Sequence, residues 1–187
     1  MIPVLQLAQS LRYALKDMQS AKISDFEIIE TINQAASLLY TRMAEQHVVY
    51  SLKRKPLILD ESGACALPAD FLKIHQVGMG NDGVCTPTSY LATCNGTYRI
   101  AGDMFYAPEG VYGLEYYYVP ARVSSLGDNL DVPQAMSPYI ERLSLAIYGN
   151  NLEAAEQIIE TCVKSLAARE LSHFADVGPV QVLGGRI

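Results

Sequence analysis

The sequence predicts an α+β fold, in which a mainly helical body holds a small inserted antiparallel β-sheet and ends in an extended C-terminal tail. Apolar residues recur at helical spacing before residue 50 and after residue 134, and two of the expected helices are long. Between residues 56 and 122, Pro and Gly separate short runs rich in Val, Ile and Tyr. Hydrophobic residues make up 50% of the 187 residues, which is enough for one ordinary domain with a buried core.

Two helices are expected in the first quarter of the chain. An apolar stripe with spacings of three and four predicts the first helix at residues 4–18. Ser24 and Glu27 fit a capping box, which places the start of the second helix. Its apolar face continues to about residue 46.

The middle of the chain predicts short strands joined by turns. Gly102 and Asp103 form a two-residue loop with glycine first, as a type II′ hairpin requires. Residues 60–63 are expected to close another hairpin between the first two strands. The predicted strands are residues 57–59, 64–67, 72–77, 98–101, 104–106 and 114–119.

Helices return near residue 134. Ser137 before Pro138 is typical of a helix start, and Asn151 is expected to cap the last helix. The apolar pattern fails after residue 175. We therefore expect one domain over residues 1–175, with a helical body at 1–50 and 134–175, an inserted β region at 56–122 and a tail at 176–187.

Composition excludes several classes of protein. The formal net charge of −6 and the pI near 5.0 argue against a protein that grips nucleic acid mainly by neutralising phosphates. No segment predicts a membrane-spanning helix, and the first residues lack the features of a signal peptide. We therefore expect no membrane partner and reduced thiols at the four cysteines. The mean hydropathy of +0.10 favours some apolar surface buried between chains.

No motif predicts catalysis, a cofactor or a metal. Cys65, His75, Cys85 and Cys94 are spaced nine or ten residues apart, whereas zinc sites usually draw ligands from close pairs. There is no nucleophile elbow, and the glycines of residues 78–83 lack the Lys-Ser/Thr of a P-loop. We expect a structural protein rather than an enzyme, with residues 78–83 as a flexible loop between strands.

Two groups of residues leave alternatives open. The basic run Lys53-Arg54-Lys55 is either a solvated connection between helix and sheet or a contact with an acidic surface or DNA backbone. Tyrosines crowd the last predicted strand and its approach, where they serve either core packing or a subunit or tail interface. These tyrosines are Tyr112, Tyr116, Tyr117 and Tyr118.

The order of these features carries a resemblance to a known family. Residues 67–74 close a hairpin, residues 98–106 make the next, residues 114–120 give a tyrosine-rich strand ending in proline, and residues 128–133 lead into the closing helices. This succession, over residues 24–175, resembles the head–tail connector (adaptor) proteins of tailed bacteriophages, especially the short-tailed ones.

The resemblance implies a structural virion protein, made in the host cytoplasm and assembled at the head–tail interface. Such connectors form a homo-oligomeric ring, commonly of twelve copies, between the portal protein and the tail or nozzle proteins. Double-stranded DNA passes through the ring without specific binding. The helices at residues 24–46 and 151–174 would pack side by side and against neighbouring copies, and the sheet would face the tail or the outer wall of the ring.

The resemblance also implies a role for the C-terminal tail. Val180, Val182, Leu183 and Ile187 would enter clefts of the portal, with Arg186 paired to an acid there. Composition alone instead favours simple disorder for residues 176–187. Two other functions stay open: an oligomeric enzyme or ligand-binding domain with an unrecognised pocket, and another phage head or tail completion protein.

Overall fold

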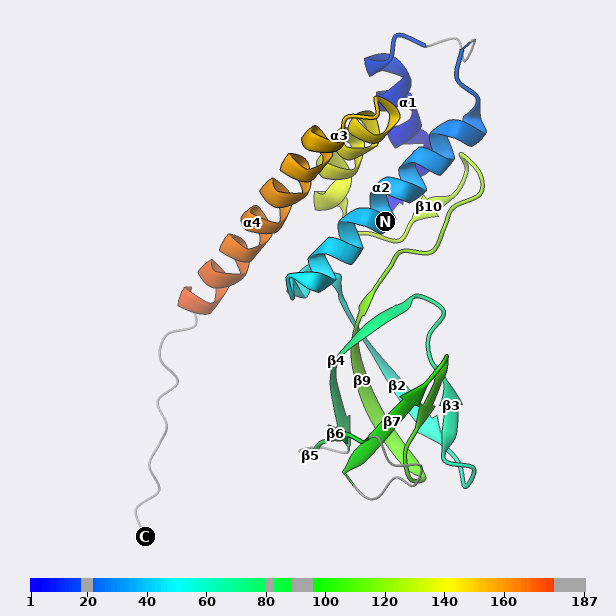
Figure 1. Ribbon diagram of the computed structural model, residues 1–187, viewed down its shortest axis with the longest axis vertical. Coiled ribbons are helices and arrows are strands. Elements are labelled where there is room, and N and C mark those ends of the chain that lie inside the picture. Colours follow the sequence, from blue (N-terminus) through cyan, green and yellow to red (C-terminus); the bar gives the residue numbers. More distant parts are fainter. Residues whose placement is uncertain (18–21, 80–82, 89–95, 177–187) are drawn as a thin grey trace.

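Helices gather at one end of an elongated molecule and strands at the other, as Figure 1 shows. The computed structural model describes residues 1–17, 22–79, 83–88 and 96–176, with side chains described as far as residue 169. The α+β class fits. The expected mainly helical body with one small sheet is wrong, because the described strands form three sheets, two of them four-stranded.

The helical end is built from α1 and α2 in the first part of the chain and α3 and α4 in the last part. Their apolar stripes meet in one core, in which Leu11, Ile32, Leu39 and Leu143 are buried. Removing each such side chain from water contributes roughly 1.5–3 kcal/mol. The helices are α1 Val4–Ala14, α2 Asp25–Glu45, α3 Ser137–Tyr148 and α4 Leu152–Asp176, with short 3-10 turns at η1 Val49–Ser51 and η2 Gln134–Met136.

Three of the predicted helix ends can be compared with the structure. The capping box is confirmed, because the Glu27 N–H donates to Ser24 Oγ and the Ser24 N–H donates to the Glu27 carboxylate. Asn151 caps α4 by accepting from the Ala154 N–H at 3.0 Å. Ser137 makes no side-chain cap, because η2 runs directly into α3.

The first helix is shorter than predicted, ending at Ala14 rather than residue 18. Lys16 adopts a left-handed backbone with φ of 56°, and the Asp17 N–H donates back to the Arg12 carbonyl at 2.8 Å. This left-handed turn stops the helix.

One four-stranded sheet follows directly from the helical end. Its strand order is β2 Leu52–Leu59, β9 Gly110–Tyr118, β4 Phe71–Met79 and β5 Gly83–Val84, and all of its pairs are antiparallel. β2 begins at Leu52 rather than near residue 56, so the basic run Lys53–Lys55 lies inside a strand. The run is therefore part of a strand rather than a connection between helix and sheet, although Arg54 and Lys55 are exposed to solvent. Gly78 and Gly83 belong to β4 and β5, and residues 80–82 lie outside the described residues.

The second four-stranded sheet contains β3 Ala64–Ala66, β8 Met104–Tyr106, β7 Thr97–Ala101 and β6 Thr86–Pro87. The predicted β7–β8 hairpin is confirmed, with Gly102 at φ 58° in its turn. The predicted hairpin across residues 60–63 is wrong, because these residues lead from β2 in one sheet to β3 in the other. The pair β6–β7 is parallel, so the β region is not purely antiparallel as expected.

Aromatic rings join the two sheets. Phe105 stacks on Tyr98 at a centroid distance of 5.5 Å and meets Tyr112 of the first sheet at 5.8 Å. All three rings are buried. A third, two-stranded sheet pairs β1 Ile2–Pro3 with β10 Asn129–Leu130 within the helical end, and no sequence pattern indicated it.

Candidate functional site

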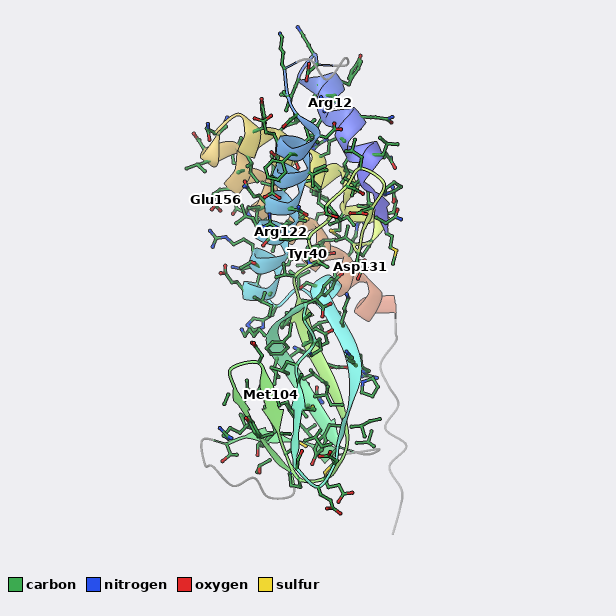
Figure 2. The ribbon with its side chains drawn as sticks, turned by 90° about the vertical axis from the view of Figure 1, so that its right-hand side faces the viewer. Arg12, Tyr40, Met104, Arg122, Asp131 and Glu156 are labelled. Atoms are coloured by element: carbon green, nitrogen blue, oxygen red, sulfur yellow. The ribbon has the colours of Figure 1, made fainter. Side chains whose placement is uncertain are left out.

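The candidate site is the joint at which the helical end meets the first sheet. Tyr118, the last residue of β9, packs against Tyr40 of α2 with ring centroids 5.0 Å apart and hydroxyl oxygens 3.3 Å apart. Both side chains are buried. Figure 2 shows Tyr40, Arg122 and Asp131 at the level where helices give way to strands. Burial strongly raises the pKa of the Tyr40 phenol, so this phenol stays neutral.

Lys53 of β2 ties the two ends together at this joint. Its Nζ lies 2.8 Å from a carboxylate oxygen of Asp70 and 2.7 Å from one of Asp131. The ammonium also sits 4.0 Å from the centre of the Tyr118 ring. Asp131 follows β10 at the helical end, whereas Asp70 precedes β4 of the sheet. One cation therefore bridges a carboxylate from each end.

The charges at the joint stabilise one another. Burial alone would lower the pKa of Lys53, but hydrogen bonds to Asp131 and Asp70 outweigh it and raise the pKa. Burial would raise the pKa of Asp70, but hydrogen bonds from Lys53 and Tyr116 lower it overall. Tyr116 donates to Asp70 at 3.0 Å, and burial together with this bond raises the Tyr116 pKa to about 12. At neutral pH the Lys53 ammonium is charged, the Asp70 carboxylate is charged and the phenol is neutral.

The opposite face of β9 makes a second contact between the two ends. The buried Tyr117 hydroxyl lies 3.5 Å from His47 Nδ1, just after α2, and 3.3 Å from His75 Nδ1 in β4. Both imidazole rings meet the Tyr117 ring edge to face. β9 is therefore clamped on both faces where it reaches the helices.

The connection from β9 back to the helices is pinned to α2. The buried Asn33 amide accepts from the Val123 N–H and donates to the Val123 carbonyl, each at 2.9 Å. Arg122 forms an ion pair with Glu30 one turn earlier on α2. These contacts fix the path of the chain as it leaves the sheet.

A pocket of about 550 Å³ opens beside the joint. The start of β2, the turn before β4 and the connection after β9 enclose it. Its volume falls within the range of small-ligand sites. The polar and aromatic lining residues are Lys53, Lys55, Asp70, Phe71, Tyr116 and Arg122.

The structure brings only some of the predicted interface residues together. Tyr116, Tyr117, Tyr118 and Lys53 meet at the joint, whereas Tyr112 lies between the two sheets. All four predicted tyrosines are buried within the single chain, which agrees with the core alternative and leaves none of their rings exposed for a neighbour.

The other predicted residues lie elsewhere. Arg54 pairs with Glu115 on the outer face of the first sheet, and Lys55 is exposed. The predicted portal-docking residues Val180, Val182, Leu183, Arg186 and Ile187 lie outside the described residues.

Sequence reasoning missed Tyr40, Asp70, Asp131 and Asn33 as members of the joint. Lys53 is 17 residues from Asp70 and 78 from Asp131, and Asn33 is 90 residues from Val123. No local spacing relates partners so far apart. Only the buried position of Asn33 on the apolar face of α2 could have signalled a polar group that needs a partner.

The described residues were compared with the requirements of metal sites, reactive thiols and membrane-spanning helices. No cluster of three or more His, Cys, Asp or Glu side chains there is arranged to hold a metal ion. Burial raises the pKa of the Cys162 thiol to about 12 and also raises that of Cys85, so both stay protonated at neutral pH. Within the same residues, no helix combines the length and apolar character needed to span a membrane.

No protein-family model matches the chain, and no curated protein matches it either.

Proposed function

We propose that this protein is a structural, non-enzymatic ring subunit that joins the portal of a phage head to its tail. In this role twelve or a similar number of copies enclose the DNA channel, the portal binds one side of the ring, and tail or nozzle proteins bind the other. The protein is made in the host cytoplasm and functions in the virion. The proposal starts from the family resemblance of residues 24–175 and draws support from two features of the structure and from the charge of the chain.

The observation that carries the proposal is the placement of exposed apolar side chains at both ends of an elongated molecule. Tyr13, Phe26 and Leu152 are exposed at the helical end, and Ile58 and Val111 form an exposed cross-strand pair at the far end of the sheets. Exposed apolar side chains that lie next to one another, as Ile58 and Val111 do, are typical of contacts with other proteins. A subunit held between two different partners needs two such separate surfaces.

The joint provides a second line of support. A connector has to hold its two binding surfaces at a fixed separation while DNA is packaged and ejected. Lys53 with Asp70 and Asp131, together with the packed Tyr40 and Tyr118 rings, fastens the helical end to the sheets. Such a fastening suits a rigid spacer between two partners.

The charge of the chain provides the third. Acidic residues outnumber basic ones by six, so a ring of such chains carries a strongly negative field. A channel wall of this sign repels the phosphate backbone, which allows DNA to slide through without being held.

A docking experiment tests the proposed function. Purified chain is mixed with the portal protein encoded in the same genome, and binding is followed by co-sedimentation. The proposal predicts that the full chain binds portal and that deleting residues 176–187 weakens binding at least about tenfold with the fold unchanged by circular dichroism. Normal binding by the truncated chain would refute the role of the tail. No binding by the full chain would refute the connector role itself.

One observation favours a second candidate function, a ligand-binding domain. The 550 Å³ pocket beside the joint presents Lys55 and Arg122 together with the Phe71 and Tyr116 rings. An anionic aromatic metabolite is the ligand class that such a lining would suit. Thermal stabilisation of the chain by a compound of this class, lost in Lys55→Ala, would support this alternative over the connector.

A further inference from the structure

The Tyr117 hydroxyl and two imidazole nitrogens gather at the joint. The hydroxyl oxygen lies 3.3 Å from Nδ1 of His75 and 3.5 Å from Nδ1 of His47. Tyr117 is fully buried, whereas both histidines are exposed. The three residues come from β9, from β4 and from the turn after α2. Three atoms of types that ligate metal ions therefore meet beside solvent.

The spacing of these atoms is unusual for hydrogen bonds. Both distances exceed the usual nitrogen–oxygen range of about 2.7–3.2 Å. The hydroxyl also carries only one proton, so it donates to only one of the two nitrogens. By contrast, two ligands of one tetrahedral ion, each about 2.0–2.1 Å from it, lie about 3.3–3.4 Å apart. The observed spacing therefore fits ligands that share an ion better than it fits two hydrogen bonds.

His47 occupies a backbone position that usually belongs to glycine. The Val48 N–H donates to the Met43 carbonyl at 2.9 Å. The His47 N–H donates to the Ala44 carbonyl at 3.2 Å, which completes a Schellman turn at the end of α2. His47 lies in the left-handed position of this turn, with φ of 58°, where a residue with a Cβ is disfavoured. Backbone strain of this kind is typical of functional sites.

His75 also sits at an irregular backbone position. Its neighbours Ile74 and Gln76 pair with consecutive residues of β9, so His75 is an extra residue in β4. Such a β-bulge re-aims a side chain and is common beside functional sites. Both histidines that reach the phenol are thus aimed by a local departure from regular structure.

The charges around the cluster have mixed effects on a cation. The carbonyl end of α2, just before His47, carries the partial negative charge of the helix dipole, which favours a cation. Lys73 stands opposite Tyr117 in the β4–β9 register, and its positive charge acts against one. Lys73 is exposed, so water and salt screen this repulsion. The ligands themselves therefore have to provide the affinity.

We propose that His47, His75 and Tyr117 form a binding site for a divalent transition metal ion such as Zn²⁺. Each neutral imidazole supplies the lone pair of Nδ1, and the phenol releases its proton to water as its oxygen coordinates the ion. A water molecule completes the tetrahedron. Because both histidines are exposed, their rings can turn to close the site around the ion.

This inference goes beyond the proposed function and does not depend on it. Its third ligand is a tyrosine, so it agrees with the lack of a cluster of three His, Cys, Asp or Glu side chains among the described residues. The ion joins the end of α2 to β4 and β9. Its binding therefore strengthens the joint between the helical end and the first sheet.

Three variants each remove one ligand. His47→Asn keeps the left-handed turn, because asparagine tolerates this position better than most residues. His75→Gln keeps a polar side chain in the bulge, and Tyr117→Phe keeps the buried ring. All three variants should retain the wild-type circular dichroism.

The matched controls change neighbours of the ligands or the remaining histidine. Gln46 and Gln76 are exposed and adjacent to the two histidines, and His173 is the third histidine of the chain. Gln46→Ala, Gln76→Ala and His173→Gln should bind Zn²⁺ as wild type does. Lys73→Gln removes the opposing charge, so it should bind Zn²⁺ at least as tightly as wild type.

Calorimetric titration of the purified full chain with zinc chloride gives the readout. We expect one Zn²⁺ per chain at this site and at least about tenfold weaker binding in each ligand variant. The visible spectrum of the chain with Co²⁺ should show tetrahedral coordination in wild type. Saturating Zn²⁺ should raise the melting temperature of wild type and controls more than that of the ligand variants.

The outcomes decide the site without reference to portal binding. No Zn²⁺ binding by wild type, or wild-type affinity in His47→Asn or His75→Gln, would overturn the inference. Wild-type affinity in Tyr117→Phe would overturn it as well, because the phenol is one of the three ligands. None of these measurements uses portal protein, so their failure leaves the connector role to its own docking experiment.

Discussion

Tyr118 at the end of β9 and Tyr40 near the end of α2 form one buried aromatic pair that joins the sheets to the helices, with ring centroids 5.0 Å apart. The two residues are 78 positions apart in sequence. Each belongs to a different half of the fold. The pair therefore packs the helical end directly against the end of the first sheet.

Removing either ring of this pair should strongly destabilise the protein. Tyr40→Ala leaves a cavity at a fully buried position, and such truncations cost about 3–5 kcal/mol. Tyr118→Phe keeps the ring and loses only its hydroxyl contacts with Tyr40 and the Asp131 carbonyl, at a cost of about 1 kcal/mol. Urea unfolding measures the free energy of unfolding of both variants. Tyr148→Ala, on the surface, is the control, and an equal loss from all three variants would contradict the role given to the pair.

Lys53 should make stability depend on pH in the acid range. Because the folded pKa of Asp70 is lowered, its contribution is complete above the unfolded pKa of about 3.9 and is lost as the pH falls through the folded pKa. Lys53→Met removes the cation, so we expect a loss of about 1–2 kcal/mol at pH 7 and a shallower fall in stability on acidification. Lys164 forms an exposed ion pair with Glu160 on α4, so Lys164→Met should change neither the stability at pH 7 nor its fall on acidification.

Urea titrations of these variants between about pH 7 and pH 2.5 provide the measurement for Lys53. Other carboxyls with lowered pKa values, such as Glu27 and Asp128, still titrate in both proteins. Only the part of the Asp70 contribution that Lys53 supplies should disappear, because the hydrogen bond from Tyr116 still lowers the Asp70 pKa. An unchanged slope in Lys53→Met would show that Lys53 does not hold the Asp70 charge.

Asn33→Ala should release the connection after β9 from α2. The substitution leaves the Val123 N–H and carbonyl without their partner in a buried place, which costs about 2–3 kcal/mol. Hydrogen exchange at the Val123 amide should accelerate together with the loss of stability. Gln34→Ala, one position along the helix and exposed, should leave both measurements unchanged. Fast hydrogen exchange at the Val123 amide of the wild type would contradict the hydrogen bond between Asn33 and Val123.

Ser24→Ala should weaken the start of α2. It removes the hydroxyl that accepts from the Glu27 N–H, and loss of such a cap costs about 1 kcal/mol. Ser37→Ala, exposed within the same helix, should leave the protein as stable as wild type or slightly more stable. The midpoint of urea unfolding distinguishes the two variants. A loss of stability at Ser37 that matched the loss at Ser24 would contradict the cap.

The sequence predicts local structure well wherever neighbours along the chain decide it. The Ser24 capping box, the Gly102 turn and the apolar helix stripes are all such cases, because their partners lie within a few residues. Strand pairing is different. Residues 60–63 have the composition of a hairpin turn, yet β2 pairs with β9 and β3 with β8. Two short strands either side of a turn look alike whether they pair together or enter separate sheets.

The candidate site was harder to predict for the same reason. The tyrosines of β9 were visible as a cluster, but their partners Tyr40, Asp70 and Asp131 come from three distant segments. Alternation along a strand also predicts one buried face. At the end of β9, Tyr116, Tyr117 and Tyr118 are all buried, because the helical end covers the second face through His47. That cover is a tertiary contact that no strand pattern contains.

We propose above that copies of this chain assemble into a ring that binds a portal. Electron microscopy of the purified full chain mixed with portal protein tests it most directly. We expect cyclic particles of many copies, commonly twelve, stacked on the portal ring. Single copies at every concentration, with the portal left bare, would contradict the claim.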